Sequence, residues 1–370
     1  MTKKNSRAFG AAVARLINKE HLSREETREF FCQILADEQT DMHQGAFLAA
    51  LKAKGETIDE IAGSWEAIYE LDTVKVKPEV SVPLVENCGT GMDAVKTFNI
   101  STAASLVAAA AGVTMAKHGA RAITSFCGTV DMAEELGVDV ECEPEIVKNS
   151  IEKAGIGLFN GMSSKVHPRA LGRILSQISF GTVLNVAASL ANPALPDYAV
   201  RGVYAKELLQ SVPVIMREIG YKRALVVYGV AEDGVSGMDE ASTLGETYVA
   251  ELMPDGKIND YSFLPEDLGI PRGKREEIIP LQDRRSEAVN LIKVLSGRVT
   301  GSRCDIVCLN AGLILYLTGL SSSIKDGFNT AQEVIGSGKA IEKLKDWVQT
   351  QNASPEAGLS KLKTLLDMAV

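Results

Sequence analysis

Residues 86–111 read ENCGTGMDAVKTFNISTAASLVAAAA, in which a turn with two glycines leads into a segment that opens with serine and threonine and continues in alanine. The stretch follows the β-branched run Val82–Val85. A strand, a glycine turn and a helix start bring backbone N–H groups and the positive end of a helix to one place, which suits an anion. A Gly-x-Gly turn alone also fits a plain tight loop, because glycine adopts positive φ without strain. The stretch therefore predicts an α/β fold with a candidate phosphate cradle at Gly89 and Gly91.

The rest of the chain after about Pro78 has the same texture. Short β-branched runs alternate with alanine-rich segments, and glycines stand at the junctions. This alternation predicts a central sheet flanked by helices. The expected strands are Val82–Val85, Val113–Lys117, Thr182–Asn185, Ala224–Tyr228 and Ile306–Leu309. The expected helices are Ala103–Ala111, Val130–Leu136 and two amphipathic helices in the tail Ala340–Leu366.

The N-terminal part of the chain differs, because its apolar residues recur at helical spacing throughout. Two capping boxes, Ser23 to Glu26 and Thr57 to Glu60, mark helix starts. An apolar stripe follows the second box and predicts core packing or a helix-helix interface. We therefore expect a helical domain at residues 1–76 and an α/β domain at 77–370. Helical residues near 165–180 could rejoin the first domain.

Composition limits the function. The 370 residues are 45% hydrophobic, and Lys+Arg 39 against Asp+Glu 48 gives a net charge of -9. This charge makes non-specific binding to nucleic acid or anionic lipid unfavourable. The sequence has no secretory signal pattern and no apolar run of membrane-spanning length, so we expect a cytoplasmic protein. The six cysteines form no CxxC pair, and Cys304 and Cys308 lie in a strand-like apolar run that predicts buried free thiols.

Two further groups of residues extend the cradle. Lys117-His118-Gly119 ends one expected strand, and Ser125 leads to Gly128-Thr129, which opens a second helix. Two helix N-termini, a lysine and several hydroxyls suit a ligand with more than one phosphate, which Lys117 would meet as a point charge. His118 fits either a ligand contact or a structural hydrogen bond.

The third group is Asp239-Glu240, which follows the expected strand Ala224–Tyr228. Adjacent carboxylates are common on protein surfaces. Beside a phosphate cradle they also fit a metal site, because Mg²⁺ is usually held by one or two carboxylates together with phosphate oxygens and water.

These residues together resemble the anthranilate phosphoribosyltransferase family, in which the glycine turn, the Asn-Ile-Ser-Thr helix start, the Lys-His-Gly turn and the Asp-Glu loop occur in this order. Three further motifs extend the resemblance over nearly the whole chain: 45–57, 265–272 and 309–312. The resemblance implies a small N-terminal helical domain and a large α/β domain whose central mixed sheet is flanked by helices. It also implies a homodimer formed through the helical domain.

The resemblance also implies the ligands and the chemistry. The substrates would be phosphoribosyl pyrophosphate (PRPP) with Mg²⁺ and an aromatic or heteroaromatic amine, which displaces pyrophosphate without a protein nucleophile. The implied substrate-binding residues are Gly89, Gly91, Asp93, Asn99, Ser101, Thr102, Lys117, His118, Gly119, Ser125 and His167. The implied metal ligands are Ser101, Asp239 and Glu240.

The sequence departs from the family on the acceptor side. Ala120 replaces the family's asparagine, and Ala188-Ser189 replaces its Gly-Pro. Ser176 or Gln177 stands where the family has an arginine that meets the substrate carboxylate. The donor half is thus predicted to be intact, whereas the acceptor half lacks its carboxylate clamp unless Arg169 or Arg173 supplies one.

The sequence leaves two alternatives to this function. One is phosphorolysis of a nucleoside, because pyrimidine nucleoside phosphorylases share the general architecture, although their basic phosphate motif is not evident here. The other is a relative that binds nucleic acid without turnover, which requires a basic face that the net charge of -9 does not favour.

Overall fold

The computed structural model describes residues 6–91, 94–122, 126–178 and 180–370. The chain divides into two compact units, one made of Met1–Lys75 with Gly161–Pro193 and the other of Val76–Asn160 with Ala194–Val370. The chain therefore passes from the first unit to the second, returns at residue 161 and leaves again after residue 193.

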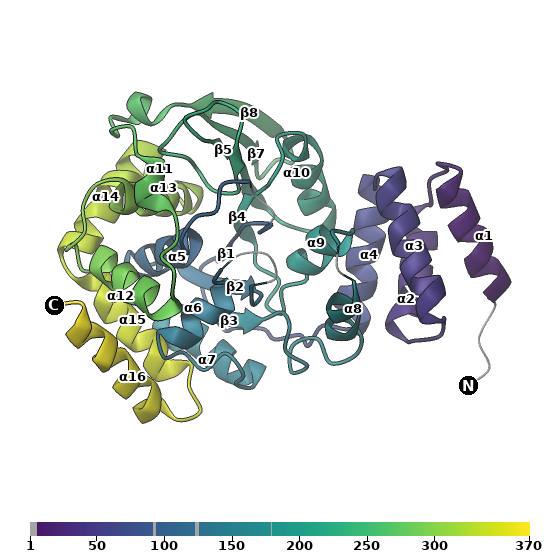
Figure 1. Ribbon diagram of the computed structural model, residues 1–370, viewed down its shortest axis with the longest axis horizontal. Helices are drawn as coiled ribbons and strands as arrows, with labels where there is room; N and C mark the ends of the chain where they lie inside the picture. The colour runs from purple at the N-terminus through teal and green to yellow at the C-terminus, as the bar shows by residue number, and fades with distance from the viewer. Residues whose placement is uncertain (1–5, 92–93, 123–125, 179) are drawn as a thin grey trace. The chain divides into compact units, whose positions relative to one another are not determined.

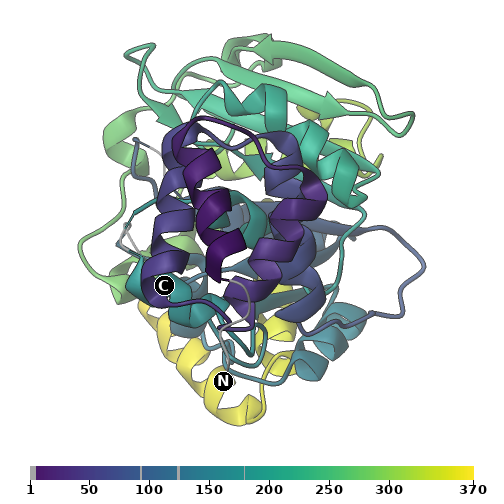
Figure 2. The same ribbon diagram turned by 90° about the vertical axis from the view of Figure 1, so that its right-hand side faces the viewer.

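The first unit is helical in its described residues, and Figures 1 and 2 show α1 to α4 side by side. Its helices are α1 Ser6–Ile17, α2 Arg24–Leu35, α3 Asp41–Lys54, α4 Ile58–Leu71, α8 Leu171–Gln177, α9 Leu184–Ala187 and the short 3₁₀ turn η1 Ala188–Leu190. Both predicted capping boxes are confirmed: Ser23 and Glu26 close the start of α2, and Thr57 and Glu60 close the start of α4.

The second unit is built on one eight-stranded mixed sheet (Figure 1). The strands are β1 Leu84–Cys88, β2 Thr114–Gly119, β3 Ile156–Asn160, β4 Tyr198–Gly202, β5 Arg223–Val230, β6 Gly237–Met238, β7 Thr247–Leu252 and β8 Ile258–Phe263. Their order is β3-β2-β1-β4-β5-β7-β8, with β6 also paired to β5. The pairs among β1 to β5 are parallel, and those of β5 with β6 and β7 and of β7 with β8 are antiparallel.

Helices cover this sheet. They are α5 Ile100–Ala110, α6 Thr129–Glu135, α7 Pro144–Ala154, α10 Leu208–Ile219, α11 Arg275–Ile278, α12 Arg284–Leu295, α13 Ser302–Leu317, α14 Ile324–Gly336, α15 Lys339–Thr350, α16 Pro355–Met368 and the 3₁₀ turn η2 Pro265–Leu268. Helices α5 and α13 pack against each other, and both are buried along most of their length. The alanines of α5 allow this close packing because they have no bulky side chains. In the described residues no helix is long and apolar enough to cross a membrane.

Three strand predictions need correction. The run Ile306–Leu309 is helical and lies inside α13. The strand prediction is wrong because a short apolar run in a buried helix cannot be distinguished from a buried strand by its periodicity. The run Thr182–Asn185 forms a turn into α9, since Asn185 Oδ1 accepts a hydrogen bond from Thr182 N at 2.8 Å. The strand predicted at Val82–Val85 begins two residues later and ends at Cys88.

Candidate active site

The glycine turn after β1 lies where the order of the sheet reverses. From β1 the chain proceeds to β2 and β3 on one side, whereas β4 and β5 lie on the other. Ligands of open α/β sheets bind at such a switch point, outside the carboxyl ends of the strands. A ligand site is therefore expected among the residues at and after the carboxyl ends of β1, β2 and β5.

The glycine turn encloses a carboxylate of the protein itself. Gly91 N donates a hydrogen bond to Asp239 Oδ2 at 2.6 Å, and Thr90 Oγ1 lies 3.4 Å from the same oxygen. A side chain at position 89 would overlap the Asp239 carboxylate, so this close approach requires glycine. The glycine turn and Asp239 are thus in contact, although 148 residues separate Gly91 from Asp239. Anion binding by this turn stays a prediction.

Lys117 lies within β2, two residues before its end. Its side chain is buried, with 1% exposed, and Nζ donates to Asn87 O at 2.6 Å and to Ser105 Oγ at 3.1 Å. Burial lowers the pKa of Lys117 to about 8, against the opposing effect of nearby Cys88, Glu86 and Glu240. The ammonium thus links the end of β1 to α5, and it titrates near physiological pH.

The start of α5 offers the expected helix N-terminus. Asn99 precedes the helix, and no side-chain capping bond forms at its position among the described residues. Its Nδ2 instead donates to Cys127 O at 3.2 Å. Thr102 is fully buried, and its hydroxyl has no hydrogen-bond partner in the described part of the chain. Ile100 N at this helix end donates to Phe98 O at 2.6 Å. Anion binding by the other N–H groups of the first turn stays a prediction.

Sequence reasoning missed a set of hydrogen bonds that joins β1 to the start of α5. Asn87 Nδ2 donates to Ser101 O at 3.1 Å and lies 3.3 Å from Ser105 Oγ, which itself donates to Ser101 O at 2.7 Å. Ser105 stands four residues after Ser101, so helical spacing could have indicated that both lie on one face. Asn87 lies in β1, two residues before Gly89, and could have been noticed there.

The second predicted helix N-terminus is not an open anion site, which corrects the prediction of two such ends. Asp131, in the first turn of α6, accepts hydrogen bonds from Ala122 N at 2.8 Å and Gly128 N at 3.0 Å, and the Arg284 guanidinium lies 3.2 Å away. Burial raises the pKa of Asp131, but these hydrogen bonds and charges hold it below its ordinary value. The protein's own carboxylate thus closes this helix end.

The remaining predicted residues of the α/β unit are placed as follows. His118 is buried in β2 opposite Phe159 of β3. Gly119 ends β2 and packs against the Thr129 side chain. Glu240 is half-buried beside Asp239. Asp93 and Ser125 lie outside the described residues.

His167 belongs to the helical unit, where it has a structural contact. Its Nδ1 donates to Asp72 O at 2.6 Å, and the Asp72 carboxylate accepts backbone hydrogen bonds from Arg169, Ala170 and Leu171 at 2.5 to 3.0 Å. Burial lowers the pKa of His167, so the imidazole is neutral at pH 7. His167 therefore helps to fix the end of α4 to the start of α8. Its contact with substrate stays a prediction.

The acceptor-side departures also have described surroundings. Ala188 and Ser189 lie in η1 of the helical unit, and the Ser189 hydroxyl donates to Asn185 O at 2.7 Å. Arg173 Nη2 donates to Gln44 Oε1 at 3.1 Å, and its guanidinium lies 3.4 Å from the carboxylates of Asp37 and Asp41. This arginine is thus engaged with side chains of its own unit.

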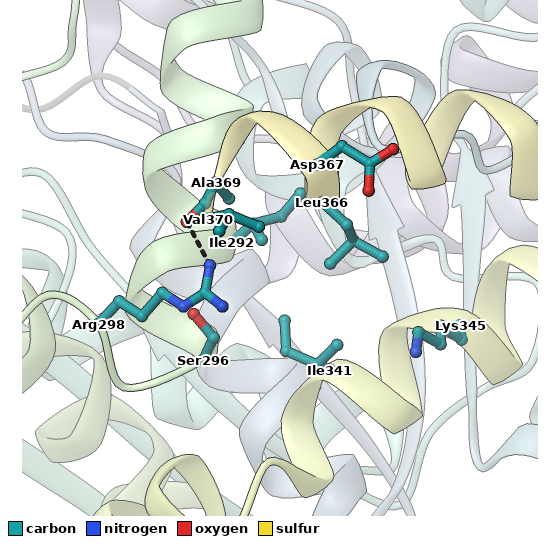
Figure 3. A pocket seen from close by; sticks show the side chains of 9 residues that line it. All are labelled: Ile292, Ser296, Arg298, Ile341, Lys345, Leu366, Asp367, Ala369 and Val370. Carbon is teal, nitrogen blue, oxygen red and sulfur yellow. Dashed lines mark hydrogen bonds between the residues drawn. The ribbon is translucent and has the colours of Figure 1, made fainter.

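A pocket of about 280 Å³ lies elsewhere, between α12, α15 and α16 (Figure 3). Arg298 Nη1 donates to Ala369 O at 2.6 Å at its edge, and Ile292 and Ile341 supply apolar lining. None of the predicted site residues lines this pocket. The cradle at the carboxyl ends of the strands is therefore a separate place.

Comparisons with known proteins agree with this geometry. Residues 81–341 match the glycosyl transferase family, a/b domain, and residues 11–71 match the helical bundle domain of the same family. An anthranilate phosphoribosyltransferase of Methanococcoides burtonii is 40% identical over 340 residues, which cover 91% of this chain and 92% of that protein. The chain belongs to the anthranilate phosphoribosyltransferase family.

Other members of the anthranilate phosphoribosyltransferase family agree in sequence and in fold. The crystal structure of the Thermus thermophilus protein has a TM-score of 0.82 and 34% identity, and the match covers 92% of this chain and 99% of that one. The Saccharomyces cerevisiae protein, solved in complex with PRPP and Mg, has the same fold with a TM-score of 0.81 and 22% identity over 94% of this chain and 98% of that one. The predicted family and the predicted fold class are both confirmed.

Proposed function

We propose that this chain is a Mg²⁺-dependent phosphoribosyltransferase, which transfers the phosphoribosyl group of PRPP to anthranilate or a related aromatic amine and releases pyrophosphate. The observation that carries the proposal is the hydrogen bond between Gly91 N and the Asp239 carboxylate. It brings the glycine turn and Asp239, which we propose to bind phosphate and metal respectively, together at the switch point of the sheet. The names of the relatives support the same activity, and the yeast relative was solved with PRPP and Mg.

The residues present suit one or more Mg²⁺ ions. Asp239 and Glu240 are adjacent carboxylates, and the former already lies against the phosphate-binding turn. Among the described residues no group of three or more His, Cys, Asp or Glu side chains could hold a metal by itself. A Mg²⁺ ion bound by these two carboxylates would take its other ligands from phosphate oxygens and water. The bound ion would supply positive charge to the departing pyrophosphate.

The protein's own groups would position and stabilise the reactants. The N–H groups of the glycine turn and of the first turn of α5 would bind phosphate oxygens, and Lys117 would add a positive charge. A phosphate oxygen that takes the Gly91 N–H must replace the Asp239 carboxylate there, and Mg²⁺ offers that carboxylate a new partner. No covalent intermediate with the protein is needed, so rate acceleration rests on orientation and on charge stabilisation.

A panel assay tests this proposal. Pyrophosphate release from PRPP is measured with a series of aromatic amines, with and without Mg²⁺, and release that requires both the amine and the metal is expected. No release with any amine would contradict the proposal. Phosphate-dependent cleavage of a nucleoside would then favour a phosphorylase, and salt-sensitive retention on DNA would favour a nucleic-acid-binding relative.

The substitution Lys117→Met is expected to weaken PRPP binding about 10- to 100-fold and to leave binding of the free aromatic amine unchanged. The reason is that a hydrogen bond to a charged group contributes about 1.5 to 3 kcal/mol, and that of the two substrates only PRPP would contact the ammonium. Calorimetric titration with each ligand separately gives both affinities. Equal losses for the two ligands, or no loss for either, would contradict the role of Lys117.

The pH dependence gives a second measure of Lys117. Its pKa of about 8 lies below the ordinary value of 10.5. Between pH 8 and pH 10.5 Lys117 is therefore protonated in the unfolded chain and deprotonated in the folded protein. The contribution of Lys117 to the free energy of unfolding therefore rises from pH 8 to pH 10.5. PRPP affinity is expected to fall over the same rise in pH. Lys117→Met should remove both dependences, which denaturant titrations and calorimetry at pH 7 and pH 9 can show.

We further propose that the protein is a cytoplasmic homodimer that associates through its helical domain, residues 1–76 together with the segment near 165–180. The family resemblance suggests this arrangement, and apolar side chains on the helical unit support it. Ile17 at the end of α1 is 65% exposed, and Met42 in α3 is 84% exposed. Sedimentation analysis of the protein and of Met42→Glu tests the proposal, and a monomeric unmodified protein would contradict it.

A further inference from the structure

Asn310 is a buried polar residue in an apolar environment. It lies in the middle of α13 with 3% of its surface exposed, and Ile306, Leu309 and Leu313 around it are completely buried. A buried amide is costly unless it is hydrogen-bonded, and asparagine is a weaker helix former than leucine. Packing of the helix alone therefore does not account for an asparagine here.

The Asn310 side chain pairs with the backbone of one distant residue. Its Oδ1 accepts a hydrogen bond from Ala241 N at 3.0 Å, and its Nδ2 donates to Ala241 O at 3.0 Å. Nδ2 also donates to Ile306 O, four residues earlier in the helix, at 2.8 Å, which orients the amide. The amide thus fixes the peptide groups on both sides of Ala241. Ala241 directly follows Asp239 and Glu240.

The segment around these carboxylates is confined at each successive residue. A side chain at Gly202 would overlap the carbonyl of Asp239, and a side chain at Gly229 would overlap the carbonyl of Glu240. Beyond Ala241, Ser242 Oγ donates to Val230 O at 2.7 Å. The backbone that carries the two carboxylates is therefore packed closely against β4 and β5, and Asn310 holds it from the side of α13.

We infer that Asn310 is a positioning residue. It holds the backbone of Asp239 and Glu240 in the position in which both carboxylates can bind divalent cations together with pyrophosphate. The inference rests on the proposed function. Asn310, in the Leu309–Gly312 motif, would then affect the reaction by orienting the metal ligands and not by contacting a substrate. Partners that orient metal ligands typically change metal affinity or activity 10- to 100-fold when they are removed.

The test is Asn310→Asp, which keeps the size of the side chain and its acceptor but loses the NH₂ group that bonds Ala241 O and Ile306 O. Asn310→Leu, which removes all three hydrogen bonds, is the second variant. The probe is Mn²⁺ in the presence of inorganic pyrophosphate, with free Mn²⁺ measured by electron paramagnetic resonance. We expect Mn²⁺ affinity to fall roughly 10- to 100-fold in both variants. Turnover assays should show a matching rise in the Mg²⁺ concentration at half-maximal rate and an unchanged KM for the amine.

Asn352→Asp is the matched control. Asn352 also donates to the carbonyl four residues earlier, Val348 O at 3.3 Å, and to a distant carbonyl, Gly137 O at 2.7 Å. It has no part in the proposed site, so its replacement should affect stability alone. Mn²⁺ affinity in either Asn310 variant equal to that of Asn352→Asp would overturn the inference.

Two further outcomes would also overturn it. One is loss of folding in both Asn310 variants while Asn352→Asp folds, because the amide would then be required for packing. The other is absence of Mn²⁺ binding by the unmodified protein. If the unmodified protein binds Mn²⁺ with pyrophosphate and the Asn310 variants do not, but no amine supports turnover, the inference stands and the proposed function fails.

Discussion

Combined replacement of Asp239 by Asn and Glu240 by Gln is expected to abolish measurable turnover and to leave the protein folded. Removal of a single group that stabilises transition-state charge commonly costs about 10²- to 10³-fold in rate, and this double variant removes both metal carboxylates. Steady-state pyrophosphate release over a range of Mg²⁺ concentrations measures the effect. An unchanged rate and an unchanged Mg²⁺ requirement would refute the assignment of these two residues.

The structure explains why folding should survive this change. Asn at position 239 keeps an oxygen that can accept the hydrogen bond from Gly91 N. The backbone carbonyls of residues 239 and 240, which pack against Gly202 and Gly229, are unchanged by the substitutions. Glu240 is half-buried at the surface of the site. The melting temperature should therefore shift by only a few degrees, which separates loss of chemistry from loss of structure. Each single variant provides an intermediate comparison.

The sequence predicted the strand, turn and helix around Gly89 because these signals are local. Strand β1, the glycine turn and the start of α5 lie within residues 84–110, so their spacing alone predicts this unit. Contacts of Gly89, Gly91 and Ser101 with PRPP stay predictions. The Asp239–Glu240 pair required a second argument, namely that Mg²⁺ binding calls for carboxylates near phosphate. The hydrogen bond from Gly91 N to Asp239 brings these two parts together in one place.

Other features depend on long-range contacts that no local pattern reveals. Helix α13 is buried along most of its length, so its apolar window Ile306–Leu309 resembles a strand. Asp131 looks like an ordinary first-turn acidic residue, but the structure shows that it closes the helix end that was expected to bind phosphate. Asn310 meets Ala241 across 69 residues, and only the folded chain shows why an amide lies there.

The acceptor side is where this chain departs most from its family, and it gives the second large prediction. The Arg173 guanidinium is engaged by Gln44, Asp37 and Asp41 of the helical unit, which neutralise a cation that could otherwise bind a substrate carboxylate. Ala120 offers no side-chain donor, and the Ser189 hydroxyl donates to Asn185 O. Arg173 and Ser189 are thus engaged within the helical unit, and a weaker carboxylate clamp than the family pattern implies stays a prediction.

We accordingly expect anthranilate to be used less well than related aromatic amines that lack the carboxylate. Burial of a carboxylate without a cation or enough donors costs several kcal/mol, which corresponds to a loss of orders of magnitude in kcat/KM. Steady-state kinetics with anthranilate and with carboxylate-free amines, at saturating PRPP and Mg²⁺, measure the difference. The comparison depends on the acceptor alone because the donor is the same in every assay.

The substitution Ala120→Asn is the matching gain-of-function test. It restores the donor that the family has at this position, and a hydrogen bond to a charged group contributes about 1.5 to 3 kcal/mol when its geometry is favourable. Use of anthranilate should therefore rise by roughly 10-fold or more, whereas use of the carboxylate-free amines should not. A micromolar KM for anthranilate with an ordinary turnover number in the unmodified protein would show that the exposed Arg169 or another group rebuilds the clamp. The departures at positions 120, 188 and 189 would then be substitutions that leave acceptor choice unchanged.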